Sequence, residues 1–291
     1  MQARIATNAA AHADRTARWA ARGERAVPRL DVPSLRSVDP TVMDRLGPTA
    51  ALLVVRPVVG VAGFVWIVAS GWWLATPLLL WFLYGSTVSA MHHLIHGSVG
   101  FGPRTRHGLL TVLGFVILES GHAWQATHLL HHRDGSDLPD PEGFVENLGW
   151  RQLPLGALQW RFRIAAWGWR HSPRRRRTSV EIANVVALTV IAVALVPITW
   201  VPLAYVALMQ LGTFLFAVLL AKGPQANFGR ETTTPLMFVH TRLIGHLLFH
   251  HHLHVEHHAY PKVPMARLDR LRPTVEAALA DDEVVRVRLA L

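Results

Sequence analysis

Residues Pro57 to Gly97 read PVVGVAGFVWIVASGWWLATPLLLWFLYGSTVSAMHHLIHG and contain no Asp, Glu, Lys or Arg. At about 1.5 Å per residue, a helix of this length is roughly twice as long as a hydrocarbon core of about 30 Å requires. The segment Gly71 to Pro77 marks the middle as a turn, because Gly and Pro interrupt helices and paired Trp residues favour the membrane interface. The stretch therefore predicts a hairpin of two membrane-spanning helices, which ends on His92 and His96, back on the side where it began.

A second uncharged stretch runs from Ile182 to Ala221 and is again about two spans long. The segment Pro197 to Pro202, which contains a Trp, marks its midpoint, so this stretch predicts a second hairpin. The two predicted outer turns carry no charge, whereas Arg is concentrated between Arg4 and Arg56 and between Arg151 and Arg177. The positive-inside rule then predicts that both termini and every histidine group face the cytoplasm.

The composition also favours a membrane protein. Apolar residues make up 51% of the chain and the mean hydropathy is +0.25, which is more apolar than an ordinary soluble domain of this length needs. The formal net charge of +10 is mostly Arg beside the apolar stretches, a placement that indicates the cytoplasmic side of a membrane rather than a nucleic-acid binder. The chain has no Cys, which excludes disulfides, thiolate zinc sites and Cys-ligated iron–sulfur clusters.

The predicted fold is an all-α integral membrane protein, with four transmembrane helices arranged as two hairpins and a cytosolic helical cap that carries the histidines. Residues 1–48 are predicted to form a cytosolic N-terminal arm, 49–275 the membrane domain with the site, and 276–291 a C-terminal cytosolic tail. Between the hairpins, the apolar stretch Gly108 to Gly121 is too short to span and predicts a re-entrant, interfacial or buried helix. Residues Trp150 to Arg177 interleave Trp and Phe with Arg, as an amphipathic helix in the headgroup layer does.

Three groups of histidines lie at helical spacing. The first is His92 and His96, the second is His128, His131 and His132, and the third is His254, His257 and His258. Residues three or four apart share one face of a helix, so the members of a group can converge on a metal ion. The second and third groups repeat an H-x-x-H-H pattern, in which the two adjacent histidines diverge by about 100°, so one group can bind two metals. Eight imidazoles suit two metal ions with about four ligands each. A single pair of histidines near a bilayer is explained more simply as polar side chains at the membrane interface, but that explanation does not account for three groups. The predicted metal ligands and catalytic residues are His92, His96, His128, His131, His132, His254, His257 and His258.

The residues that flank these groups resemble a known family. The imidazole ligands alone leave Fe, Zn, Cu and Ni open. The motifs are His92-His93-Leu94-Ile95-His96-Gly97-Ser98, then Asp140-Pro141-Glu142 after the second group, and His254-Val255-Glu256-His257-His258-Ala259-Tyr260-Pro261-Lys262-Val263-Pro264. Together with the order of the spans, they resemble the histidine boxes of the membrane fatty acid desaturase and hydroxylase superfamily, which includes carotenoid ketolases and hydroxylases. The resemblance covers roughly residues 50 to 275, and His93 stands where these proteins often have Asp or Glu.

The resemblance implies a di-iron enzyme. It implies two iron ions on an almost all-histidine ligand set, O2 as co-substrate, and electrons from an external ferredoxin or cytochrome b5-like donor. The implied reaction removes hydrogen from an unactivated C–H bond of a lipid-like acyl or terpenoid substrate, in contact with membrane lipid. Desaturation of an acyl chain is the first prediction, but the boxes are shared with hydroxylases and ketolases of acyl, polyketide or carotenoid substrates. A His-lined metal transporter and a b-type haem protein are the alternatives from other classes, although transporter sites usually lie near the bilayer midplane.

Three further residues are candidates for an additional ligand or for support of the ligands. Family members often place another His or a water-holding Asn near the end of the fourth span, where this chain has Asn227. His250, four residues before the third box, offers a ninth imidazole, and His93 lies within the first box. His251 and His252 are interpreted as polar residues at the membrane interface.

Overall fold

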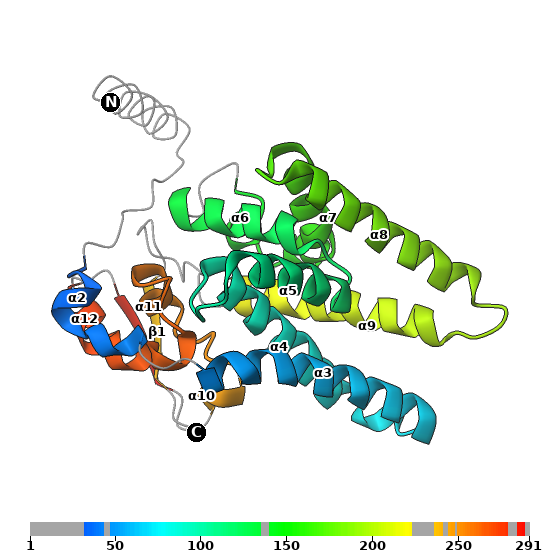
Figure 1. The fold of residues 1–291 in the computed structure, drawn as a ribbon, viewed down its shortest axis with the longest axis horizontal. Helices are drawn as coiled ribbons and strands as arrows, with labels where there is room; N and C mark the ends of the chain where they lie inside the picture. The colour runs from blue at the N-terminus through cyan, green and yellow to red at the C-terminus, as the bar shows by residue number, and fades with distance from the viewer. Residues whose placement is uncertain are drawn as a thin grey trace.

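A computed structural model describes residues 32–43, 47–134, 140–222, 236–240, 244–247, 249–278 and 284–288. Most of these residues are helical, as the sequence predicts (Figure 1). The elements in chain order are α2 (Leu35–Val38), η1 (Pro40–Met43), α3 (Gly47–Ser70), η2 (Trp73–Ala75), α4 (Thr76–His96), α5 (Pro103–Val116), α6 (Gly121–Asp134), η3 (Gly143–Asn147), α7 (Leu153–His171), α8 (Arg175–Ala194), α9 (Val201–Phe216), the π-helix η4 (Ala217–Lys222), β1 (Leu236–His240), α10 (Ile244–Leu247), α11 (His254–Ala259), η5 (Met265–Leu271), α12 (Arg272–Ala277) and β2 (Val284–Arg288).

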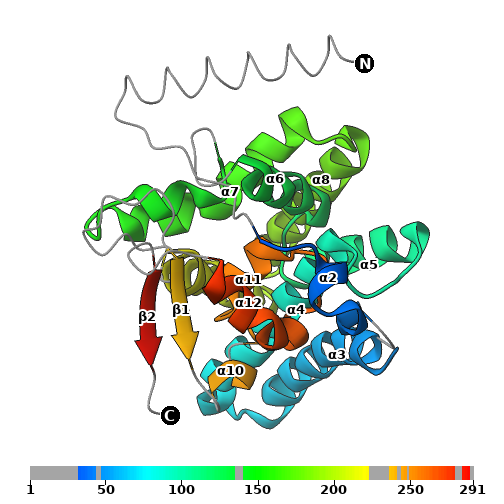
Figure 2. The same cartoon turned by 90° about the vertical axis from the view of Figure 1, so that its left-hand side faces the viewer.

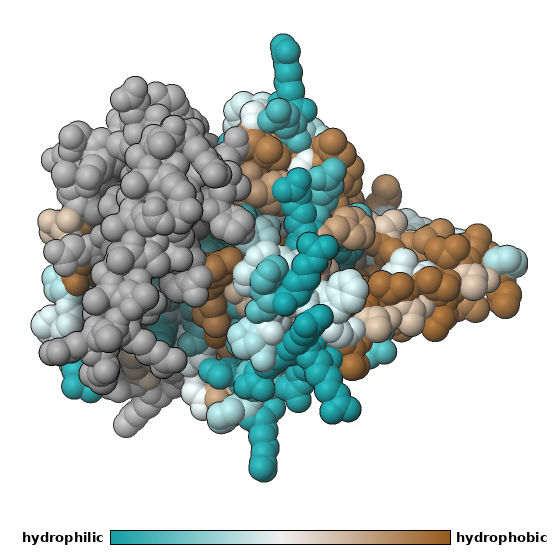
Figure 3. Space-filling view, turned by 90° about the horizontal axis from the view of Figure 1, so that it is seen from above, coloured by the Kyte–Doolittle hydropathy of each residue, from teal (hydrophilic) through white to brown (hydrophobic). Residues whose placement is uncertain are grey.

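Four helices of the described chain are long and apolar enough to cross a membrane. They cover residues 50–70, 73–96, 175–194 and 201–222, so the predicted number of spans is confirmed. Helix α3 approaches α4 closely at Gly60, where an added Cβ would lie 3.0 Å from the Cα of Leu83. The α3–α4 and α8–α9 connections lie at the same end of the molecule (Figure 1). Figure 3 shows hydrophobic surface over that end and hydrophilic surface over the middle, as the absence of charges from the two sequence stretches predicts.

Helices α5, α6 and α7 pack against the long helices and place the second histidine group. Helix α6 approaches α7 so closely that a Cβ on Gly168 would lie 2.5 Å from the Cβ of Ala123. Glu181 of α8 is buried. It accepts hydrogen bonds from three side chains, one on α5, one on α6 and one just before α6. This single carboxylate therefore ties the start of α6 to both neighbouring helices. The three donors are Thr111, Ser120 and His122.

The third histidine group belongs to a smaller unit built from both ends of the described chain (Figure 2). Helix α11, η5 and α12 share an apolar core with Val42 of η1. Two hydrogen bonds join the same segments, from the hydroxyl of Tyr260 to the carbonyl of Pro33 at 2.7 Å and from Arg267 to the carbonyl of Val42 at 2.7 Å. The chain between Val32 and Met43, predicted as part of a cytosolic arm, is thus a packing partner of the third box.

One element adds to the all-α prediction. Strands β1 and β2 pair in parallel, with Leu236 opposite Val284 and His240 opposite Arg288. The sequence analysis predicted no strand, because neither segment alternates polar and apolar residues for long enough to stand out. The pair brings a segment from the predicted C-terminal tail next to the chain that precedes the third box.

Candidate metal centre

The eight predicted ligands come from three helices that meet at one place. His92 and His96 occupy the last turns of α4, the second box lies on α6, and the third box lies on α11. Helix α4 stops directly after His96 because Gly97 adopts a left-handed conformation with φ of 66°, which glycine reaches without steric cost. The backbone N–H of Gly97 donates to the carbonyls of His93 and Leu94 and so caps the helix end.

The structure brings the eight side chains together in two groups. In the larger group each residue offers one ring nitrogen, and these nitrogens all lie within 4.8 Å of one another. The adjacent residues of each H-x-x-H-H box fall into different groups, as their divergence of about 100° around the helix predicts. The grouping is five and three, whereas the sequence analysis expected about four and four. The larger group is His92, His96, His128, His132 and His257, and the smaller group is His131, His254 and His258.

The donor atoms of the larger group fit a metal ion better than they fit each other. The Nε2 atom of His128 lies 2.9 Å from Nε2 of His96 and 3.2 Å from that of His132, and Nε2 of His257 lies 2.9 Å from that of His132. A neutral imidazole carries one proton, so four converging nitrogens cannot all be satisfied by hydrogen bonds among themselves. A buried nitrogen of His92, Nδ1, also has no hydrogen-bond partner among the described residues. Lone pairs arranged in this way suit a transition-metal cation.

Burial keeps several of these imidazoles in the form that binds metal. Removal from water lowers the pKa of His132, His257 and His258 well below its usual value, and it lowers the pKa of His254 to about 3. These rings are therefore neutral at physiological pH, and a neutral imidazole nitrogen is the metal ligand.

Two carboxylates accept hydrogen bonds from histidines of the second box. Asp140 accepts a hydrogen bond from Nδ1 of His131 at 2.7 Å, and Glu142 accepts one from Nδ1 of His128 at 2.8 Å. Each bond holds the ring proton on Nδ1 and leaves Nε2 free to bind a metal. Burial lowers the pKa of His131, but the hydrogen bond and charge of Asp140 outweigh that effect and raise it to about 10. Without a metal this ring therefore carries a proton on both nitrogens, and a metal ion must displace the proton on Nε2 to bind there. The Asp-Pro-Glu tripeptide marks these two carboxylates in the sequence as a family motif, but their contacts to His131 and His128 are visible only in the structure.

The further candidates lie outside both groups or outside the described chain. His93 is buried beside His92, with ring centroids 6.2 Å apart, but it belongs to neither group. His250 belongs to neither group either. Asn227 lies outside the described residues. His251 is not an interfacial residue as interpreted above, because its ring lies 6.1 Å from that of His92 and its Nε2 is buried.

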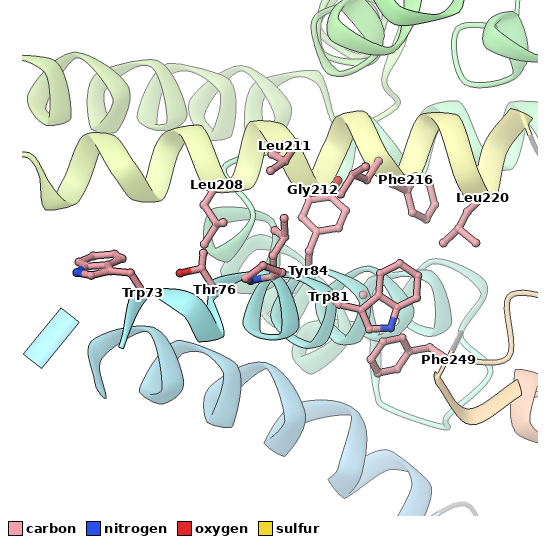
Figure 4. A pocket seen from close by; sticks show the side chains of 14 residues that line it. Trp73, Thr76, Trp81, Tyr84, Leu208, Leu211, Gly212, Phe216, Leu220 and Phe249 are labelled. Carbon is pink, nitrogen blue, oxygen red and sulfur yellow. The ribbon is translucent and has the colours of Figure 1, made fainter. Parts of the chain in front are cut away.

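An apolar cavity of about 360 Å³ lies between α4 and α9 (Figure 4). None of the described residues that line it carries a charge. One end is at Trp73, whose ring packs at 4.8 Å against Trp200 in the α8–α9 connection. At the other end the lining includes Phe216 and Phe249 (Figure 4). The Phe216 ring lies 6.2 Å from Trp124, which packs 6.0 Å from His128 of the larger group. A cavity of this kind holds hydrocarbon rather than a polar ligand, because no group in it compensates the desolvation of a charge.

The fold and the site define an integral membrane protein with a histidine-rich centre suited to metal binding. The model of the fatty acid desaturase family matches residues 65–289, and the chain belongs to this family. Family membership makes the protein a membrane oxidoreductase. A search of curated proteins found no match.

Proposed function

We propose that this protein is an O2-dependent di-iron oxidoreductase that desaturates a lipid-like acyl chain. The observation that carries the proposal is the arrangement of eight buried or half-buried histidines from α4, α6 and α11 in two adjacent groups. In this assignment the larger group holds one iron ion and the smaller group holds the second. When bound, the two ions supply O2 activation strong enough to oxidise an unactivated C–H bond.

The protein's own residues orient the ligands and keep water away. Asp140 and Glu142 fix the protons of His131 and His128 on Nδ1, so that the opposite nitrogens face the ions. The buried ring of Trp124 packs 6.0 Å from His128 and covers the larger group on the side of the cavity. Exclusion of water protects a reactive oxidant from side reactions, which suits an enzyme that attacks hydrocarbon.

The cavity between α4 and α9 is the proposed site of the substrate's hydrocarbon chain. Its lining is apolar, it lies between two candidate spans, and at one end Phe216 contacts Trp124, which packs against His128. An acyl chain or a terpenoid chain meets these conditions. The boxes do not distinguish desaturation from hydroxylation or ketolation, so the alternative is a hydroxylase or ketolase with the same centre.

The proposed orientation follows from charge and from the positions of the spans. Helices α3 and α4 form one hairpin across the bilayer, and α8 and α9 form the other. The histidine centre then faces the cytoplasm, because the exposed Arg174 to Arg177 lie at the start of α8 while the α3–α4 and α8–α9 connections carry no charge. An external ferredoxin or cytochrome b5-like donor supplies electrons from that side.

Metal analysis and one pair of variants test the proposal. Purified protein should contain about two irons per chain, and His257→Ala should abolish product formation while the protein stays folded in detergent. His171→Ala is the matched control, because His171 is an exposed histidine on α7. Mass spectrometry of host lipids separates a loss of two hydrogens from a gain of one oxygen. One zinc per chain, or unchanged turnover by His257→Ala, would refute the di-iron assignment.

A further inference from the structure

The end of the cavity away from Trp73 is lined by aromatic rings that include Phe216, Phe249 and Trp81 (Figure 4). We refer to Phe216 and Phe249 as the wall. Phe249 fits into a notch in α4 at Gly85, where an added Cβ would lie 2.5 Å from its ring. A second contact on the same helix, to Phe82 at 6.5 Å between ring centroids, also holds the ring. Phe249 is buried, so α4 and the loop before the third box fix this half of the wall.

The loop that carries Phe249 adopts a costly backbone conformation. Phe249 has φ of 49° and His250 has φ of 64°, both in the left-handed region that non-glycine residues rarely adopt. Such a conformation is unfavourable for a non-glycine residue and persists only where the surroundings impose it. The strain directs the Phe249 ring into the notch at Gly85 and leaves His251 beside the larger histidine group. Strained backbone of this kind is found at ligand contacts more often than at simple packing sites.

The other half of the wall, Phe216, stands between the cavity and the metal centre. Its ring lies 6.2 Å from Trp124 and 5.9 Å from His251. Those two residues in turn touch the larger group, with Trp124 6.0 Å from His128 and His251 6.1 Å from His92. Among the residues that the structure describes, no histidine lines the cavity. A chain in the cavity is therefore separated from the predicted ligands by Phe216 and the one layer of rings behind it.

Phe216 also occupies an unusual place in its helix. It is the last residue of α9, and the π-helix Ala217–Lys222 follows directly. A π-helix shifts the side chains after it around the helix axis and is frequent at functional sites. Here the change of helix type begins at the boundary between the cavity and the centre.

We propose that Phe216 and Phe249 determine which carbon of the substrate chain is oxidised. This inference rests on the proposed function. A chain that runs between the cavity and the centre must pass the edge of the Phe216 ring, while Phe249 blocks the alternative course along α4. The two rings thus fix the depth at which the chain lies and present one short segment of it to the oxidant. In an apolar pocket, a change of one or two methylene groups alters discrimination by about tenfold or more.

The first test measures the position of oxidation in host lipids by tandem mass spectrometry. Wild-type protein should give one dominant position, and Phe216→Ala should lower its preference over neighbouring carbons by about tenfold. Phe216→Tyr keeps the ring and should keep the position. Phe214→Ala is the matched control, because Phe214 lies on the same helix and packs on the core without lining the cavity. Iron content should be the same in all four proteins.

The second test needs no turnover. A saturated hydrocarbon that carries a photoreactive diazirine is added to each protein in lipid nanodiscs, and labelled peptides are mapped after illumination. In wild-type protein and Phe214→Ala the label should stay on lining residues of α4 and α9, whereas in Phe216→Ala it should extend to residues 251–253 and to α6.

The outcomes separate the two proposals. Equal labelling of residues 251–253 in wild type and Phe216→Ala, absence of label from the cavity in wild type, or a lower yield without a change of position would overturn the role of the wall. A different outcome is that wild-type protein forms no oxidised lipid while Phe216→Ala still extends the labelling. That result would contradict the proposed reaction, but it would still support Phe216 as the barrier between the cavity and the metal centre.

Discussion

Single side chains that hydrogen-bond to the predicted ligands influence the affinity of the centre for a metal. Asp140 makes two contacts, one to Nδ1 of His131 and one to the backbone N–H of Glu142 at 2.8 Å. It therefore positions its own histidine and also the segment that supports His128. The buried carboxylate is compensated by both bonds, so removal of its charge affects two ligands at once.

The first prediction concerns this residue. Asp140→Asn should weaken metal binding by about 10- to 100-fold, because an amide is a weaker acceptor and no longer favours the required tautomer of His131. Titration with a competing chelator, followed by metal analysis, measures the change. Asp269→Asn is the control, since Asp269 is exposed on η5. Equal metal retention by both variants would mean that Asp140 does not position the ligand.

The eight histidines could be found from the sequence, but the grouping could not. Spacing of three or four residues fixes which rings share a helix face, and this holds for His92 with His96 and for the separation of His131 from His132. The assignment of His257 to the larger group depends on the angle at which α11 meets α4 and α6. That angle is set by packing between segments far apart in the chain, and no local pattern records it.

Among the helices, the contact between α6 and α7 depends on the absence of a side chain. Gly168 lies against Ala123, so the two backbones approach more closely than any larger pair of residues permits. Because α6 carries the second box, this contact sets the distance of that box from α7 and from the aromatic side chains that cover it.

The second prediction compares two glycines in helices. Gly168→Ala should destabilise the protein by about 1–3 kcal/mol, because the added methyl overlaps Ala123. Gly108→Ala should stabilise it by up to about 1 kcal/mol, because Gly108 is exposed on α5 with open space around it and Ala favours a helix. Thermal unfolding in detergent, followed by Trp fluorescence, gives both values. A stable Gly168→Ala protein would show that α6 and α7 can move apart.

At this scale the sequence predicted the long helices and missed the short elements. Uncharged stretches predicted the spans, and the turn at Gly71 to Pro77 was placed correctly because Gly, Trp and Pro act locally. The β1–β2 pair and the packing of η1 on the third box were not predicted. Both join segments that are distant in the chain and only four or five residues long, where periodicity carries little information.

For the whole molecule, the proposed orientation can be tested with single cysteines, because the chain has no Cys of its own. Leu74→Cys and Ile198→Cys place thiols in the two connections at side chains that are 97% and 81% exposed, and Arg176→Cys places one at the start of α8. A maleimide that cannot cross membranes should label the first two in intact cells and the third only after lysis. The reverse pattern would put the histidine centre on the outer side.

The union of η1 with the third box has a consequence for biogenesis. Tyr260 is synthesised 227 residues after the Pro33 carbonyl to which it donates. A nascent chain that has completed the fourth candidate span, residues 201–222, still lacks every histidine of α11. It therefore lacks three of the eight predicted ligands. A complete centre can therefore assemble only after both candidate hairpins have been synthesised, and proteolysis before α11 would leave an inserted but permanently inactive protein.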